Sequence, residues 1–262
     1  MNLVLLVGCA RSGTSILGEL IGAHPEVKYI FEAHSIWEIG GLGVNDSHRL
    51  TAENATSSVK QKIREWFESQ SEGSLVLLEK NPRNILRIPY VHAIFPEARI
   101  VHIVRDGRDV ACSMVPGCGR EEWGQLKPPS WRGLFQQYTG VERCARAWKD
   151  IVEIGLHDLS TVSHIHVRYE DLLAEPAAHA ARILGYMGLQ MHPQVEAFSQ
   201  RIANETSAPY HAKIQDRWYE DDHRLRIGRW RENLNAEEQA SITGLLSPLL
   251  QRLGYSVNHD QT

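Results

Sequence analysis

The sequence predicts an α/β fold in three layers: a central parallel sheet of about five strands flanked by helices, plus a helical C-terminal part. Short apolar runs alternate with stretches of helical spacing over the first two thirds of the chain, which is the pattern of βαβ units. An apolar fraction of 42% is ample for a core in a chain of 262 residues, and no Pro-, Gly- or Ser-rich linker divides it. We therefore expect residues 1–262 to form a single domain.

Each expected strand is a short apolar run, and in order these are Leu3–Gly8, Val27–Phe31, Leu75–Glu79, Arg99–Val104 and His164–Val167. The expected helices fill the gaps and the C-terminal part: Thr14–Ala23, Ala52–Gln70, Asn84–Phe95, Asp109–Met114, Leu134–Leu156, Ala177–Met187 and Ala236–Leu253. His24-Pro25 and Phe95-Pro96 each close a helix, because the residue before a proline disfavours helical backbone.

The composition argues against several classes of protein. A net charge of −4 and a pI near 6.4 do not suit nucleic-acid binding through bulk positive charge. No run approaches the roughly 20 apolar residues of a membrane span, and the apolar run at the N-terminus lacks the basic flank of a signal peptide. The four cysteines form no C-x-x-C pair, so we expect reduced thiols and a cytoplasmic protein.

The segment after the first expected strand, Gly8-Cys9-Ala10-Arg11-Ser12-Gly13-Thr14-Ser15, has the pattern of a phosphate-binding loop. A strand, a glycine turn and a helix start place backbone N–H groups and a positive dipole end around one concavity. Nucleoside-triphosphate loops carry a lysine that reaches the β- and γ-phosphates, but here Thr14 holds that position and the nearest cation is Arg11. The loop therefore suits an anion other than a γ-phosphate. The alternative is a tight turn whose hydroxyls cap the helix while Arg11 is solvated.

Polar side chains follow all five expected strands at equivalent positions, namely Arg11, Glu32, Lys80, Arg105 and Tyr169. Ligands of open parallel sheets bind outside the carboxyl ends of the strands. Structural charges placed at random would not fall at five equivalent positions. We therefore expect the ligand site at this edge of the sheet.

A second anion site is indicated by Arg105-Asp106-Gly107-Arg108-Asp109, which opens a helix with Ser113 two turns past Arg105. Arg105 and Ser113 could grip one phosphate together. The alternative is a surface network in which the aspartates pair with the arginines.

Glu32 and Lys80 are the candidate catalytic residues. A carboxylate near an anion-binding loop repels the ligand, so its presence is expected only if it removes a proton; alternatively, Glu32 caps the next helix. Lys80 could place its charge on a developing leaving-group oxygen, or it could be a surface lysine paired with Glu79.

Three further groups of residues carry weaker signals. The arginines around Gly228 and Trp230 could form a solvated basic face or close over a second phosphate: Arg224, Arg226, Arg229 and Arg231. The stretches that contain Trp37, Trp123 and Trp131 could line an acceptor pocket. His164 and His166 share a strand face, but no third ligand is suggested nearby, so we expect no metal site.

Together these segments resemble the sulfotransferases that use 3′-phosphoadenosine 5′-phosphosulfate (PAPS). Arg11-Ser12-Gly13-Thr14-Ser15 is similar to that family's 5′-phosphosulfate loop, and Val104-Arg105-Asp106-Gly107-Arg108 through Ser113 to its 3′-phosphate site. The block that contains Tyr169, Val167–Leu172, is similar to the segment near the adenine. The block Ile227-Gly228-Arg229-Trp230-Arg231-Glu232 is similar to a later segment near the 3′-phosphate.

The chain is most similar to the branch that contains tyrosylprotein sulfotransferases and many bacterial enzymes. The resemblance implies that Glu32 is the catalytic base and that Lys80 stabilises the transition state. It also implies a P-loop-like fold, release of 3′-phosphoadenosine 5′-phosphate (PAP), and no requirement for a metal. Cytosolic small-molecule members use a histidine two residues after the lysine; Pro82 stands there, so no histidine base is carried over.

The expected function is transfer of a sulfuryl group from PAPS to a hydroxyl of a carbohydrate, lipid or secondary metabolite. We expect no nucleic-acid partner and no membrane span. A nucleotide kinase-like phosphotransferase is the main alternative, against which Thr14 in the lysine position speaks. A non-catalytic PAP-binding protein is a further alternative, made less attractive by Glu32 and Lys80.

Overall fold

The computed structural model describes residues 2–71, 73–117, 123–204 and 227–257, and its core is a five-stranded parallel sheet. The strand order is β2-β3-β1-β4-β5, with every neighbouring pair parallel. The bounds are β1 Leu3–Val7, β2 Val27–Phe31, β3 Val76–Lys80, β4 Arg99–Val104 and β5 His164–Arg168. The predicted α/β class, the parallel sheet and the P-loop-like arrangement are confirmed.

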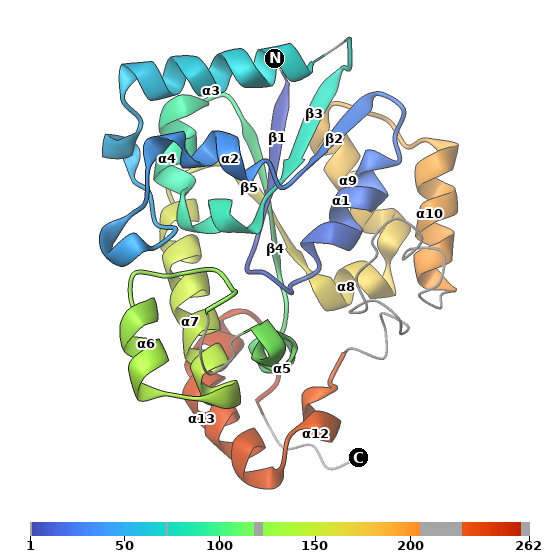
Figure 1. Ribbon diagram of the computed structural model, residues 1–262. Coiled ribbons are helices and arrows are strands. Elements are labelled where there is room, and N and C mark those ends of the chain that lie inside the picture. Colours follow the sequence, from blue (N-terminus) through green and yellow to red (C-terminus); the bar gives the residue numbers. More distant parts are fainter. Residues whose placement is uncertain (1, 72, 118–122, 205–226, 258–262) are drawn as a thin grey trace.

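Helices cover both faces of the sheet (Figure 1). One face is covered by α1 Thr14–Gly22, α8 Tyr169–Ala174, α9 Pro176–Met187 and α10 Pro193–Ala203. The other face is covered mainly by α3 Ser57–Gln70, α4 Ile88–Ile94, α5 Gly107–Met114, α7 Gly140–Leu159 and α13 Ala236–Arg252. Short elements complete the described chain: α2 His34–Trp37, η1 Glu38–Gly40, η2 Val44–Asp46, η3 Ala52–Asn54, η4 Pro82–Leu86, η5 Val115–Gly117, α6 Trp131–Gln137 and α12 Trp230–Asn233.

The central strand β1 divides the hydrophobic interior into two clusters. Its side chains alternate, with Leu3, Leu5 and Val7 in the cluster on the α7 side and Val4 and Leu6 in the cluster on the α1 side. All five are buried, as expected for a central parallel strand covered on both faces.

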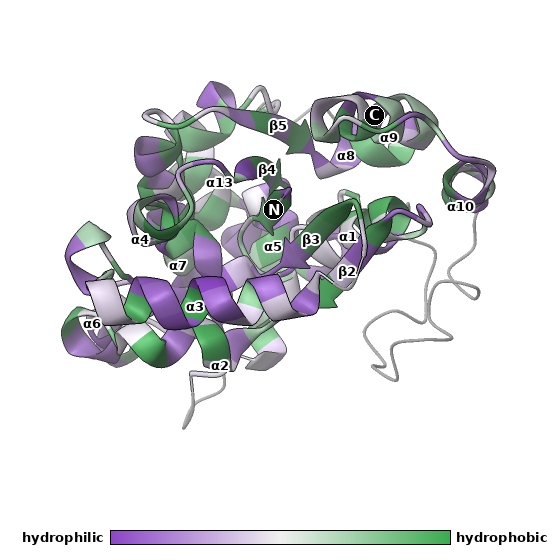
Figure 2. Ribbon diagram, turned by 90° about the horizontal axis from the view of Figure 1, so that it is seen from above, coloured by the Kyte–Doolittle hydropathy of each residue, from purple (hydrophilic) through white to green (hydrophobic). Residues whose placement is uncertain are grey.

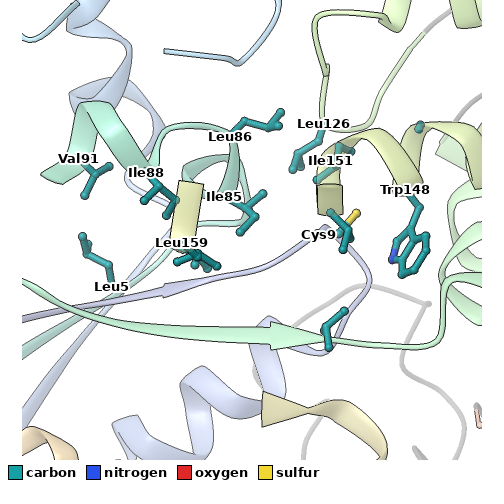
Figure 3. Packing of buried hydrophobic residues seen from close by; sticks show 14 of the residues in the cluster. Leu5, Cys9, Ile85, Leu86, Ile88, Val91, Leu126, Trp148, Ile151 and Leu159 are labelled. Carbon is teal, nitrogen blue, oxygen red and sulfur yellow. The ribbon is translucent and has the colours of Figure 1, made fainter. Parts of the chain in front are cut away.

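The larger cluster reaches up to the loop that follows β1. Figure 3 shows Cys9 of that loop beside Ile85, Ile151 and Trp148. The loop is therefore anchored to the core on one side while its other side remains available for a ligand. The ribbon of α3 alternates hydrophilic and hydrophobic bands (Figure 2), as expected of an amphipathic helix, and the helix buries Ile63 and Phe67.

Three predicted helices are divided in the structure, and several helices were missed. The predicted helix over 52–70 is η3 followed by α3, because Thr56 caps α3 by accepting the backbone N–H of Val59. The prediction over 84–95 is η4 followed by α4, and that over 134–156 is α6 followed by α7, with Gly140 at a positive φ of 53°. The sequence analysis did not predict α8 or α10, nor the short helices α2 and α12.

Candidate active site

A cavity of about 340 Å³ opens at the carboxyl ends of the strands. Several separate segments line it: Ala10, Arg11, Gly13, Thr14, Ser15, Ile16, Glu32, His34, Pro82, Arg83, Arg105, Ser113, Gly117, Gly124, Gln125, Leu126 and Tyr169. Four of the five polar residues predicted at the strand ends are among them. The fifth, Lys80, lies just behind the wall, because it is the last residue of β3 and its side chain is 1% exposed.

The glycine loop presents an open helix start to this cavity. Gly13 is the N-cap of α1 with φ of 92°, and within the described residues no side chain caps that end. The first N–H groups of a helix have no intrahelical acceptor, and Thr14 and Ser15, which carry two of them, line the cavity. A Cβ at Gly13 would overlap the Tyr169 ring, so this turn requires glycine.

The two predicted cations meet at this loop. The Arg105 guanidinium stacks over the Tyr169 ring with its Cζ 4.7 Å from the centroid, and Nη1 donates to the Arg11 carbonyl at 3.4 Å. Arg11 Nε donates to Ser113 Oγ at 3.0 Å. The loop after β1 and the helix α5 after β4 therefore form one continuous cationic wall. Arg105 also lies 3.5 Å from Asp109, and both side chains are buried, so this pair does not belong to a solvated surface network.

Glu32 stands opposite this wall and is held by two groups. Lys80 Nζ forms an ion pair with Glu32 Oε1, and His34 Nε2 lies 3.0 Å from Glu32 Oε2. The Lys80 ammonium also lies 3.6 Å from the centroid of the Phe31 ring. The alternative in which Lys80 is a surface lysine paired with Glu79 is not seen. Lys80 is buried and pairs with Glu32, the candidate base.

These contacts fix the charge state of Glu32. Burial raises the pKa of Glu32, but the hydrogen bond with His34 and the Lys80 charge lower it to about 2. The pKa of Lys80 is lowered overall, because the effect of burial outweighs the neighbouring Glu32 charge, which raises it. In the free protein Glu32 is therefore a carboxylate over the whole physiological pH range.

A buried carboxylate beneath the site supports the turn that carries Glu32. Glu79 accepts the indole N–H of Trp37 at 3.1 Å and the amide N–H of Asn84 at 3.2 Å. The backbone N–H of Ala33 also bonds to Glu79, and burial raises the pKa of Glu79 to about 7. Glu79 thus ties η4 and the start of α2 to β3.

Several predicted binding residues lie outside the cavity wall. Ser12 is buried beneath the loop, and its hydroxyl has no hydrogen-bond partner among the described residues. Gly228 and Trp230 are bound to α5, where both backbone N–H groups donate to Asp109 at 2.7 and 3.2 Å. Arg229 lies between them in the same turn. Arg224 and Arg226 lie outside the described residues.

Two of the stretches that contain tryptophans do reach the cavity, through His34 of the helix with Trp37 and through residues 124–126 beside Trp123, but no tryptophan is among its described lining residues. Trp37 and Trp123 are buried in the larger hydrophobic cluster, and Trp131 packs against it. Besides the predicted residues, His34, Arg83 and Gln125 also line the cavity. His34 is the one of these with a sequence signal, because it stands two residues after Glu32 at a helix start.

The comparison with known families decides the class of the protein. The model of the sulfotransferase family matches residues 4–193. The chain belongs to the sulfotransferase family.

Relatives agree with this assignment. The sulfotransferase is 21% identical to protein-tyrosine sulfotransferase A of Caenorhabditis elegans over 97% of the chain and 67% of that protein. It spans 52–72% of the lengths of three protein-tyrosine sulfotransferases that it matches.

Its fold is similar to a sulfotransferase domain from the curacin biosynthetic pathway, with a TM-score of 0.64, 13% identity and coverage of 98% and 99% of the two chains. It is also similar to a mouse sulfotransferase complexed with PAP, with a TM-score of 0.55, 15% identity and coverage of 95% and 85%. None of the described helices of this sulfotransferase is long and apolar enough to cross a membrane. The described residues also form no group of three or more His, Cys, Asp or Glu side chains able to hold a metal ion.

Proposed function

We propose that this sulfotransferase moves a sulfuryl group from PAPS to an acceptor hydroxyl and releases PAP. The observation that carries the proposal is the cavity itself: a cationic wall built by Arg11 and Arg105 faces a carboxylate paired with a buried lysine. PAPS carries anionic groups at its 5′ and 3′ positions, so it needs two linked anion sites. We further propose that residues 1–262 act as one domain.

The residues present fit such a donor. The open start of α1 and Arg11 suit the 5′-phosphate, with Thr14 and Ser15 beside it. Arg105 and Ser113 suit the 3′-phosphate, because a guanidinium and a hydroxyl donate several hydrogen bonds to one anion. Tyr169 contributes a ring face for the adenine side. Ser12 supports the loop from below, and the turn Gly228-Arg229-Trp230 supports Arg105 through Asp109.

The catalytic roles follow from the chemistry of in-line transfer. PAPS supplies the electrophilic sulfur and a phosphate leaving group. Glu32 takes the acceptor's hydroxyl proton as the acceptor oxygen bonds to sulfur. The bond from sulfur to the bridging oxygen breaks, and Lys80 neutralises the electron pair that leaves on that oxygen. Arg11 holds the departing phosphate in place.

The phosphotransferase alternative is disfavoured by Thr14, which stands where a γ-phosphate lysine would be needed. The non-catalytic alternative is disfavoured by Glu32 and Lys80, since a carboxylate beside an anion site weakens binding unless it does chemistry. The acceptor classes to test are carbohydrates, lipids and secondary metabolites. Tyrosine peptides join them because relatives carry that activity in their names.

A screen with sulfur-labelled PAPS and these acceptors tests the proposal directly. We expect label transfer to at least one hydroxyl class, no stimulation by magnesium, and calorimetric binding of PAP well above ADP. Glu32→Gln should retain PAP binding and lose turnover. Preference for ATP with magnesium would support the phosphotransferase, and PAP binding without transfer to any class would support the non-catalytic protein.

A further inference from the structure

Both oxygens of the proposed base are occupied in the free protein. Lys80 holds Oε1 and His34 holds Oε2. A carboxylate with a pKa of about 2 is a poor proton acceptor, because general-base efficiency needs a pKa closer to the working pH. One of the two contacts must therefore be given up before Glu32 can act.

The contact to be given up is the one with Lys80. In the proposed reaction the Lys80 ammonium is needed at the leaving-group oxygen. The ammonium lies on the α1 side of the sheet, where the negative charge of Glu19 in α1 raises the pKa of Lys80. When the positive charge moves toward the donor, Oε1 becomes free and the pKa of Glu32 rises. If Lys80 were the only group holding the Glu32 carboxylate, this movement would also leave the carboxylate without a fixed orientation.

The contact between His34 and Glu32 does not depend on Lys80. Its own N–H donates to the Glu32 carbonyl at 2.6 Å, and the N–H of Ala33 between them is tied to buried Glu79. Glu32 adopts a φ of 46°, in the left-handed region that a glutamate seldom occupies, so this turn is held by its surroundings. The geometry places the imidazole against the carboxylate independently of Lys80.

The tautomer of His34 follows from its burial. Nδ1 is buried, and in the described part of the protein it has no hydrogen-bond partner. A proton there would be an unpaired buried donor, so the neutral ring carries its proton on Nε2 and donates it to Glu32 Oε2.

We propose that His34 is a positioning residue for the reaction: it keeps Oε2 of Glu32 while Lys80 leaves Oε1 for the donor. The freed Oε1 then accepts the acceptor's proton. This inference rests on the proposed function, in which Glu32 is the base. The other charged groups around the pair come from separate elements, namely Arg11 before α1, Arg83 in η4, His48 before η3 and Glu79 in β3.

The first test reads the tautomer of His34 without any turnover. In ¹⁵N-histidine-labelled free protein at neutral pH, long-range ¹H–¹⁵N spectra should show the His34 proton on Nε2, with His34→Gln providing the assignment. A proton on Nδ1 overturns the proposal. This readout stands even if no sulfated product is found, which would refute the proposed function alone.

The second test compares His34→Leu, which removes the donor, with His34→Gln, which keeps an N–H near the position of Nε2. His34→Leu should lower kcat roughly 10- to 100-fold, the range expected for a lost hydrogen bond to a charged group. The acid limb of its kcat/KM profile should move to higher pH, since the hydrogen bond lowers the pKa of Glu32. His34→Gln should restore both, with PAP affinity unchanged throughout.

His92→Leu, at the exposed end of α4, is the matched control and should leave the profile in place. A merely structural His34 would lower stability and kcat without moving the acid limb. An unmoved limb in His34→Leu, or failure of His34→Gln to restore it, overturns the positioning role while the proposed function stands.

Discussion

Arg11 Nε donates a hydrogen bond to Ser113 Oγ at 3.0 Å, across 102 positions of sequence. One residue belongs to the loop after β1 and the other to the helix after β4, two neighbouring strands of the sheet. Ser113 still has its own O–H to donate to a ligand, because the contact with Arg11 uses a lone pair. The two proposed anion sites are therefore mechanically coupled through a single serine.

This coupling predicts different ligand selectivity for two variants. Arg105→Ala should weaken PAP roughly 10- to 100-fold, the loss expected for a charge-assisted contact, and should leave AMP almost unchanged. Ser113→Ala should weaken both nucleotides, because it also releases the Arg11 side chain. Calorimetry with PAP and AMP measures the four affinities. Equal losses of PAP and AMP in Arg105→Ala would place the 3′-phosphate elsewhere.

The loop predicts a sharp contrast between two glycines. Gly13→Ala puts a Cβ into the Tyr169 ring at a φ of 92°, which should cost roughly 2–4 kcal/mol and abolish PAP binding. Gly185→Ala, on the exposed side of α9 with open space around its Cβ, should instead stabilise by about 0.5–1 kcal/mol. Denaturant unfolding and PAP calorimetry compare the two variants. A tolerated Gly13→Ala would mean that Tyr169 is free to move aside.

The sequence predicted the sheet well because each strand is a short apolar run ending in a polar residue. The position of Arg105 and Ser113 at the cavity could be anticipated from helical spacing alone. Their link to Arg11 could not, since it depends on which strands are neighbours in the sheet.

Other features depended on packing that local patterns do not encode. The place of Lys80 at a strand end predicted it at the site but not its burial: the strand extends one residue further than predicted and buries Lys80 beside Phe31 and Glu32. The stretches around Trp37 and Trp123 reach the cavity, but the two large apolar rings are buried in the core. The break before α7 lies at Gly140, whose positive φ no helical periodicity predicts.

Two paired histidines predict a loss of stability in mild acid. His102 on β4 and His166 on β5 have their Nδ1 atoms 3.1 Å apart, and burial, followed by the His166 charge, holds the pKa of His102 well below 6.5. The unfolded chain then binds the proton more tightly than the folded one. The contribution of His102 to stability should be full above pH 6.5 and should fall by up to about 1.4 kcal/mol per pH unit below it.

The variant His102→Leu isolates this effect. On acidification from pH 7.5 to 5.5 the variant should lose less stability, or gain more, than the parent, measured by urea unfolding at each pH. Glu79 acts in the opposite direction, because its raised pKa makes ionisation between about pH 4.5 and 7 unfavourable, but it is present in both proteins. The exposed-residue control His92→Leu should keep the full slope. Identical slopes in all three proteins would contradict the prediction.

Asp109 predicts how far the late turn depends on α5. Its two oxygens accept the N–H groups of Gly228 and Trp230, and it faces Arg105 at 3.5 Å with its side chain 1% exposed. Asp109→Ala removes both acceptors and leaves Arg105 without this carboxylate, so we expect a loss of roughly 3–5 kcal/mol in stability. Hydrogen exchange should show faster exchange of both amides, and PAP affinity should fall.

The matched control is Glu142→Ala, which removes the exposed ion pair with Arg146 and should lower stability by less than about 1 kcal/mol. Unchanged exchange at Gly228 and Trp230 in Asp109→Ala would mean that the turn is held by the contacts of the Trp230 ring with Arg108 and Arg231 rather than by the carboxylate.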